Sequence, residues 1–120
     1  MPATVNLLPR KCFEIALEDG TIIKGQFGTW ALKRFCDKGG LTLGEAEEKL
    51  RGISGIIDYI LCAVEYVSRQ NKESFSYTDM NVCQWVDDIG GHNSEAFLKL
   101  IGHTVDENNT EDAGEKKTET

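Results

Sequence analysis

The sequence predicts a mainly α fold: a compact helical domain of about five helices with a short N-terminal β-hairpin and a disordered acidic C-terminal tail. Three observations predict it. Apolar residues recur at helical spacing over most of the chain. In one stretch before them, apolar residues alternate with polar or small ones, as in a half-buried strand. The end of the chain has almost no apolar side chains. In a chain of 120 residues we expect one domain at residues 1–103, followed by the tail at residues 104–120.

The β-hairpin is expected at about residues 13–27. Apolar residues alternate with polar or small ones from Phe13 to Glu18, which is the period of a strand with one buried face. Asp19-Gly20 is a strong two-residue turn signal, because glycine tolerates the positive φ that such turns need. Two strands alone are only marginally stable in water. We therefore expect the hairpin to lie on the helices or to pair with another chain.

Five helices are expected after the hairpin, and several of their ends carry clear signals. Gly39-Gly40 follows the last periodic residue of the first helix, where glycine is common. Thr42-x-x-Glu45 is a capping box, in which a hydroxyl and a carboxylate each satisfy a backbone N–H at the start of the second helix. The helices are expected at about residues 28–38, 43–51, 53–71, 79–89 and 94–102.

The last three helices have distinct apolar sides, and the third is expected to be central. Its stripe begins at Ile53 and recurs at helical spacing as far as Val67, which is wide enough for burial on most sides. The fourth helix is expected to be capped by Thr78, with Asp79 in its first turn. In the fifth helix, the side chains expected to face inward are Phe97, Leu98 and Ile101.

Charge and composition argue against a nucleic-acid partner and against a membrane protein. The net charge is −7, and the lysines and arginines are scattered, whereas a nucleic-acid-binding protein normally concentrates them. No run of about 18 apolar residues is present, and the N-terminus lacks the basic-then-apolar order of a secretory signal. We therefore expect a cytoplasmic protein.

The sequence contains no recognisable catalytic or metal-binding motif. A phosphate-binding loop, GxGxxG, HExxH and GxSxG are all missing. The four cysteines form no CxxC pair, and three lie in apolar segments, where we expect small buried hydrophobic side chains. Cys83 with His92 is the best candidate for a Cys–His pair, although no local feature supports it. We expect no enzymatic activity, no cofactor and no metal.

Asp87-Asp88, at the end of the fourth helix, is an unusual feature. Acidic side chains in a last helical turn oppose the negative end of the helix, at roughly 0.3–1 kcal/mol each. Adjacent helical positions point about 100° apart, so the two carboxylates do not converge on one ligand. Solvated surface charge, a basic group within the fold and a basic partner remain alternatives. Our hypothesis is that both aspartates and Trp85 form a partner-binding edge, while Trp30 and Trp85 each suit either the core or an interface.

Two longer patterns connect these segments with a known family. They are Phe27-Gly28-x-Trp30-x-Leu32-x-x-Phe35, and Tyr77-Thr78-Asp79 followed by Trp85-Val86-Asp87-Asp88. Over about residues 13–91 the chain resembles the tail assembly chaperones of long-tailed bacteriophages and prophages. The resemblance implies a mostly helical, non-enzymatic protein in the cytoplasm of the bacterial host cell. It also implies binding of the tape measure protein and recruitment of tail tube subunits.

These patterns give one expected site and one alternative function. The expected partner-binding residues are Phe27, Trp30, Tyr77, Trp85, Asp87 and Asp88. Self-association through the exposed edge of the hairpin is a further expectation, because an unpaired strand edge can pair with another chain. The alternative is a small helical adaptor or regulatory protein that acts through protein–protein contacts.

Overall fold

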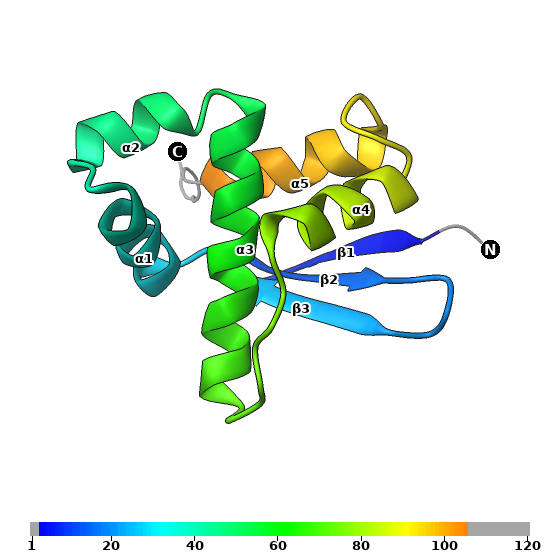
Figure 1. Cartoon of the computed structure of the whole chain (residues 1–120). Coiled ribbons are helices and arrows are strands. Elements are labelled where there is room, and N and C mark those ends of the chain that lie inside the picture. The colour runs from blue at the N-terminus through cyan, green and yellow to red at the C-terminus, as the bar shows by residue number, and fades with distance from the viewer. Residues whose placement is uncertain (1–2, 106–120) are drawn as a thin grey trace.

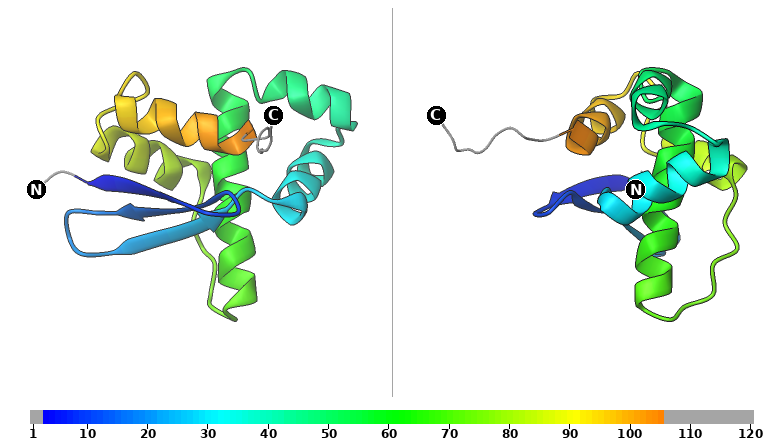
Figure 2. Two further views of the ribbon diagram at one scale, coloured as in Figure 1. Left: turned by 180° about the vertical axis from the view of Figure 1, so that it is seen from behind. Right: turned by 90° about the vertical axis from the view of Figure 1, so that its left-hand side faces the viewer.

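The computed structural model describes residues 3–105, which form a three-stranded antiparallel sheet and five helices (Figure 1). The elements are β1 (Thr4–Leu8), β2 (Cys12–Ala16), β3 (Ile22–Gln26), α1 (Thr29–Gly39), α2 (Leu43–Lys49), α3 (Ile53–Gln70), α4 (Asp79–Asp88) and α5 (Glu95–Val105). In Figures 1 and 2, α4 and α5 lie over one face of the sheet, and α3 crosses the end at which β3 finishes. Residues 104 and 105 belong to α5, and the rest of the expected acidic tail lies outside the described residues.

The expected fold class, mainly α with a two-stranded hairpin, is wrong. Thr4–Leu8 forms a third strand, which pairs with β2 in antiparallel register and places Val5 opposite Ile15. The turn between these strands has no usual sequence signal, because Arg10 and Lys11 take positive φ values of 62° and 60°, where glycine or asparagine is common. The fold is therefore α+β, with helices packed on an antiparallel sheet.

The sheet has one buried and one exposed face, because side chains alternate along each strand. β2 is the central strand, and Phe13, Ile15 and Ile23 face the helices and are buried. Glu14 and Lys24 lie opposite each other on the other face. β3 forms one edge of the sheet, and its exposed Lys24 weighs against pairing with a second copy, since lysines and short edge strands discourage such contacts.

His103 ties α5 to the sheet. Its Nε2 atom lies 2.9 Å from the carbonyl oxygen of Leu8 and 2.8 Å from that of Cys12, on either side of the β1–β2 turn. Because both partners are acceptors, Nε2 carries the proton in this arrangement. A residue near the end of the described chain thus holds a turn near its beginning.

The core is built around α3 and a group of aromatic rings. Phe27, between β3 and α1, has its ring centroid 4.8 Å from that of Phe13 and 5.0 Å from that of Tyr59. The ring of Phe35 on α1 lies 5.8 Å from Tyr59 by the same measure. α3 carries buried side chains through most of its length, as its wide apolar stripe predicted. Within residues 3–105, no helix combines the length and apolarity needed to cross a membrane.

Two side chains expected in the core are exposed instead. Ile53, the first residue of α3, is 52% exposed, because no earlier turn of that helix lies beside it. Leu98 of α5 is 57% exposed. The inward side of α5 is formed by Phe97, Leu100 and Ile101 at helical spacing, and Leu98 lies about 100° away from Phe97 around the helix.

The local signals around α1 and α2 are confirmed. Gly40 ends α1 with a φ of 62°, in the left-handed region that glycine adopts readily. The side-chain oxygen of Thr42 accepts from the backbone N–H of Glu45 at 3.2 Å, and the Glu45 carboxylate accepts from the N–H of Thr42 at 2.9 Å. This reciprocal pair fixes the start of α2.

Candidate functional site

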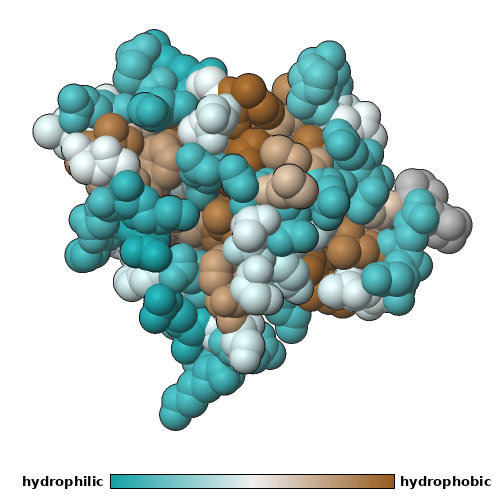
Figure 3. Space-filling model, in the orientation of Figure 1, coloured by the Kyte–Doolittle hydropathy of each residue, from teal (hydrophilic) through white to brown (hydrophobic). Residues whose placement is uncertain are grey.

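A groove with an apolar floor lies between the start of α3 and α4. It has a volume of about 280 Å³ and is lined by Ile53, Ile57, Cys83, Val86, Asp87 and His92. We call it the α3–α4 groove. In Figure 3, apolar surface gathers at the upper centre, over the start of α3 and over α4. Exposed apolar surface with a polar rim is typical of interaction sites.

Helical spacing arranges most of the lining residues in two rows. Ile53 and Ile57 are four residues apart on α3, so their side chains share one side of that helix. Cys83, Val86 and Asp87 are three and four residues apart on α4 and share a side in the same way. Ile57 and Val86 are buried, whereas Ile53 and Cys83 are exposed above them. The two buried side chains thus form an apolar floor, and the two exposed side chains can be contacted by a partner.

The loop after α4 adds His92 to the groove. Gly90 and Gly91 have φ values of 118° and 95°, which residues with a Cβ rarely adopt. The N–H of Gly91 donates to the carbonyl oxygen of Val86 at 2.8 Å, which closes the end of α4. The chain then reverses, so that His92 lines the same groove as residues of α4.

The α4 side of the groove belongs to an acidic part of the chain. From Glu73 to Leu98 the sequence has five acidic residues and no lysine or arginine. Asp87 lines the groove, and both Asp87 and Asp88 are exposed. Among the ion pairs formed within residues 3–105, none includes either aspartate. Within the described residues, the alternative of a basic group in the fold is therefore not supported, and the other two alternatives are solvated charge and a basic partner.

Three of the six expected partner-binding residues belong to the interior or its margin. Phe27 is fully buried, and Trp85 is 4% exposed. The Trp85 ring meets the ring of half-buried Tyr77 edge-on, with centroids 4.9 Å apart. These rings pack within the fold and present little surface to a partner.

The other three expected residues lie at the surface in two places. Trp30 on α1 is half-buried beside Tyr66, with ring centroids 5.7 Å apart, and the Arg69 guanidinium carbon lies 5.8 Å from its ring centre. Asp87 and Asp88 are at the end of α4, where only Asp87 lines the groove. The structure thus retains one of the six residues in the candidate site.

Sequence reasoning missed Ile53 and Ile57 as part of a site, because it assigned both to a core stripe. One signal was present: Gly52 precedes Ile53, so Ile53 begins the helix and lacks an earlier turn to cover it. Cys83 and His92 had been paired only as a candidate nucleophile and base. Both line the groove, but within residues 3–105 no hydrogen bond joins them.

Thiol reactivity should distinguish the groove cysteine from the core cysteine. The expectation that three cysteines are buried is wrong: Cys83 is exposed, Cys12 and Cys36 are half-buried, and only Cys62 is buried. Burial raises the pKa of the Cys62 thiol to about 11, so this thiol stays protonated near neutral pH. We expect iodoacetamide to label Cys83 in the folded protein and Cys62 only after denaturation, as measured by mass spectrometry. Equal labelling of both in the folded protein would contradict the burial.

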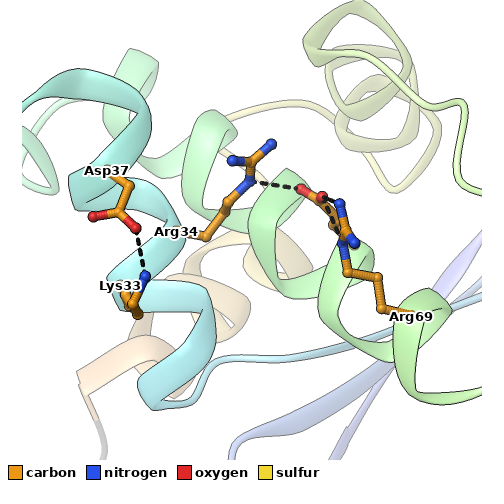
Figure 4. Close-up of polar contacts among 5 residues, drawn as sticks. Lys33, Arg34, Asp37 and Arg69 are labelled. Atoms are coloured by element: carbon orange, nitrogen blue, oxygen red, sulfur yellow. Dashed lines mark hydrogen bonds and ion pairs between the residues drawn. The ribbon is translucent and has the colours of Figure 1, made fainter.

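A cluster of charged side chains lies where α1 meets α3, and its acidic and basic members pair with one another (Figure 4). Glu65 is 5% exposed, and its carboxylate accepts from Nε of Arg34 at 3.2 Å and from Nε of Arg69 at 3.0 Å. Lys33 pairs with Asp37 along α1 at 2.6 Å. Because these charges are satisfied within the fold, the cluster stabilises helix packing, and the α3–α4 groove is the stronger candidate for a partner.

Glu65→Gln should lower the free energy of unfolding by about 1–3 kcal/mol, because a neutral amide replaces a buried acceptor of two charged hydrogen bonds. Glu47→Gln on the exposed side of α2 serves as the control, with a change within about 0.5 kcal/mol. Urea denaturation measures both values. A Glu65→Gln protein as stable as the parent would show that the two arginines do not depend on the charge.

The described residues offer contact chemistry at the groove rather than a metal centre. Within residues 3–105, no three His, Cys, Asp or Glu side chains gather closely enough to hold a metal ion. Comparison of the chain with protein-family models, curated proteins and solved structures finds no match.

Proposed function

We propose that this chain is a non-enzymatic tail assembly chaperone of a long-tailed phage or prophage. In this role it binds the tape measure protein and recruits tail tube subunits in the cytoplasm of the bacterial host cell. The observation that carries the proposal is the α3–α4 groove, an accessible apolar surface with Asp87 on its rim. The identity of the client comes from the resemblance of the segments around Trp30 and Trp85 to the chaperone family.

The groove would act by covering apolar side chains of the client. Burying one leucine or isoleucine side chain contributes about 1.5–3 kcal/mol. A groove of about 280 Å³ takes few side chains, so a single contact is weak. Several copies along one long client would hold it collectively while each copy exchanges. Such reversible contacts suit a chaperone that leaves before the tail is finished, as the resemblance implies.

Co-expression tests the proposal. The proposal predicts a long, helix-rich reading frame downstream of this gene, which encodes the tape measure protein. That protein would be produced alone and together with this chain. The proposal predicts that this chain raises the soluble yield of the client and that the two proteins elute together from a size-exclusion column. A client that stays insoluble and retains none of this chain would exclude the chaperone role and favour the adaptor alternative.

A further inference from the structure

We propose that the α3–α4 groove binds an amphipathic helix whose apolar stripe is flanked by lysine or arginine. This inference deepens the proposed function and rests on it for the identity of the client. The shape of the groove, its apolar contacts and its charge together select this helix.

The shape of the groove favours a helix. Its lining residues come mainly from two helices, α3 and α4, at three- and four-residue spacing. Side chains of a third helix repeat at the same spacing and can interdigitate with such rows, as in other helix-in-groove complexes. An extended strand would need an open sheet edge, and none of the residues that line the groove belongs to β1 or β3, the two edge strands.

The apolar contact is centred on Ile53. This side chain is 52% exposed above buried Ile57, one helical turn further along α3. A leucine of the incoming helix would pack against Ile53 and Val86 and exclude water from both. The apolar stripe of an amphipathic helix supplies such residues at three- and four-residue spacing.

Charge selects the residues beside that stripe. Asp87 lines the groove and Asp88 follows it, at the end of a helix whose last turn has no basic residue. The carbonyl groups of that turn add partial negative charge at the same place. A lysine or arginine next to the incoming apolar stripe would meet this negative charge, whereas a glutamate would be repelled.

A second copy of this chain is disfavoured as the occupant, because two groove faces would bring like charges together. The chain has a net charge of −7, and the segment from Glu73 to Leu98, which supplies four of the six groove-lining residues, contains no lysine or arginine. Two such surfaces would repel each other. The complementary occupant is therefore a basic helix of another protein.

The test uses three synthetic peptides and the full chain. The peptides share one helical leucine stripe and differ only in its flanking residues, which are lysine, glutamine or glutamate. By fluorescence anisotropy, we expect the lysine peptide to bind at least about tenfold more tightly than the glutamate peptide. Its affinity should fall as the ionic strength rises above about 0.1 M. Equal affinity for all three peptides, or binding of none, would overturn the inference.

Two matched double variants locate the effect. Asp87→Asn with Asp88→Asn should remove most of the preference for lysine over glutamate. Glu18→Gln with Glu47→Gln removes the same charge from exposed positions outside the groove and should preserve the preference. If the variant without the two aspartates keeps the preference for lysine, or if both variants lose it equally, Asp87 and Asp88 do not select the basic helix.

The peptide and client experiments fail independently. If the lysine peptide binds at the groove but the tape measure protein is neither solubilised nor co-eluted, the proposed function is wrong and this inference stands. If the tape measure protein is solubilised while the peptides show no charge preference, the proposed function stands and this inference is wrong.

Discussion

Replacement of Phe27 by alanine should lower the free energy of unfolding by about 3–5 kcal/mol. Phe27 is fully buried where the sheet meets α3, and its ring lies against those of Phe13 and Tyr59. Truncation removes both aromatic contacts and leaves a cavity that the surrounding elements cannot fill completely. Domains of this kind have a free energy of unfolding of only about 5–15 kcal/mol. The substitution should therefore remove a large part of the stability of the protein.

Urea denaturation followed by circular dichroism measures this change. Leu43→Ala is the control, because Leu43 is 57% exposed, and it should shift stability by less than about 0.5 kcal/mol. The experiment also separates the two roles considered for Phe27. A variant with unchanged stability and weakened client binding would make Phe27 a contact residue, against its position in the core.

Gly55→Ala should destabilise the protein by about 3 kcal/mol. A Cβ atom at this position would lie 2.1 Å from the carbonyl oxygen of Lys49 and 2.6 Å from its carbonyl carbon. Both atoms belong to the backbone at the end of α2, so they cannot rotate away as a side chain could. The methyl group would therefore force the end of α2 away from α3. This displacement would occur close to the α3–α4 groove.

Gly44→Ala provides a matched control for this substitution. Gly44 lies within α2, and a Cβ there meets nothing within 4 Å. Since alanine favours a helix over glycine by about 1 kcal/mol, this variant should be slightly more stable than the parent. Thermal unfolding of both variants gives the comparison. If Gly55→Ala unfolds at the same temperature as Gly44→Ala, the close approach of the two helices is not present in solution.

The elements predicted best from the sequence are those whose ends are determined by residues close to them in the sequence. Gly20 has a φ of 94° in the expected turn between β2 and β3, and the capping box of α2 is formed as expected. β1 was missed because its turn uses positive φ values at Arg10 and Lys11 and is contacted by His103 from α5. Nothing near β1 in the sequence indicates that distant contact.

The candidate site was predicted only in part. Asp87 attracted attention because an acid at the end of a helix is unfavourable by itself, which is a local signal. Ile53 looks like any other apolar residue of its stripe, and its exposure depends on how neighbouring helices cover α3. In the same way, the sequence could not separate Trp85, which packs edge-on against Tyr77 in the fold, from a tryptophan at an interface.

The central claim is that the α3–α4 groove binds the tape measure protein, and one pair of variants tests it most directly. Ile53 and Leu43 are each the first residue of a helix, and they are 52% and 57% exposed, but only Ile53 lines the groove. Aspartate suits the start of a helix, so both Ile53→Asp and Leu43→Asp should fold.

The measurement is the amount of tape measure protein that elutes with each variant after co-expression, with folding checked by circular dichroism. We predict that Ile53→Asp loses most of the client and that Leu43→Asp retains it at the level of the parent chain. Equal retention by two folded variants would mean that the client binds elsewhere, and the account of the groove would be wrong.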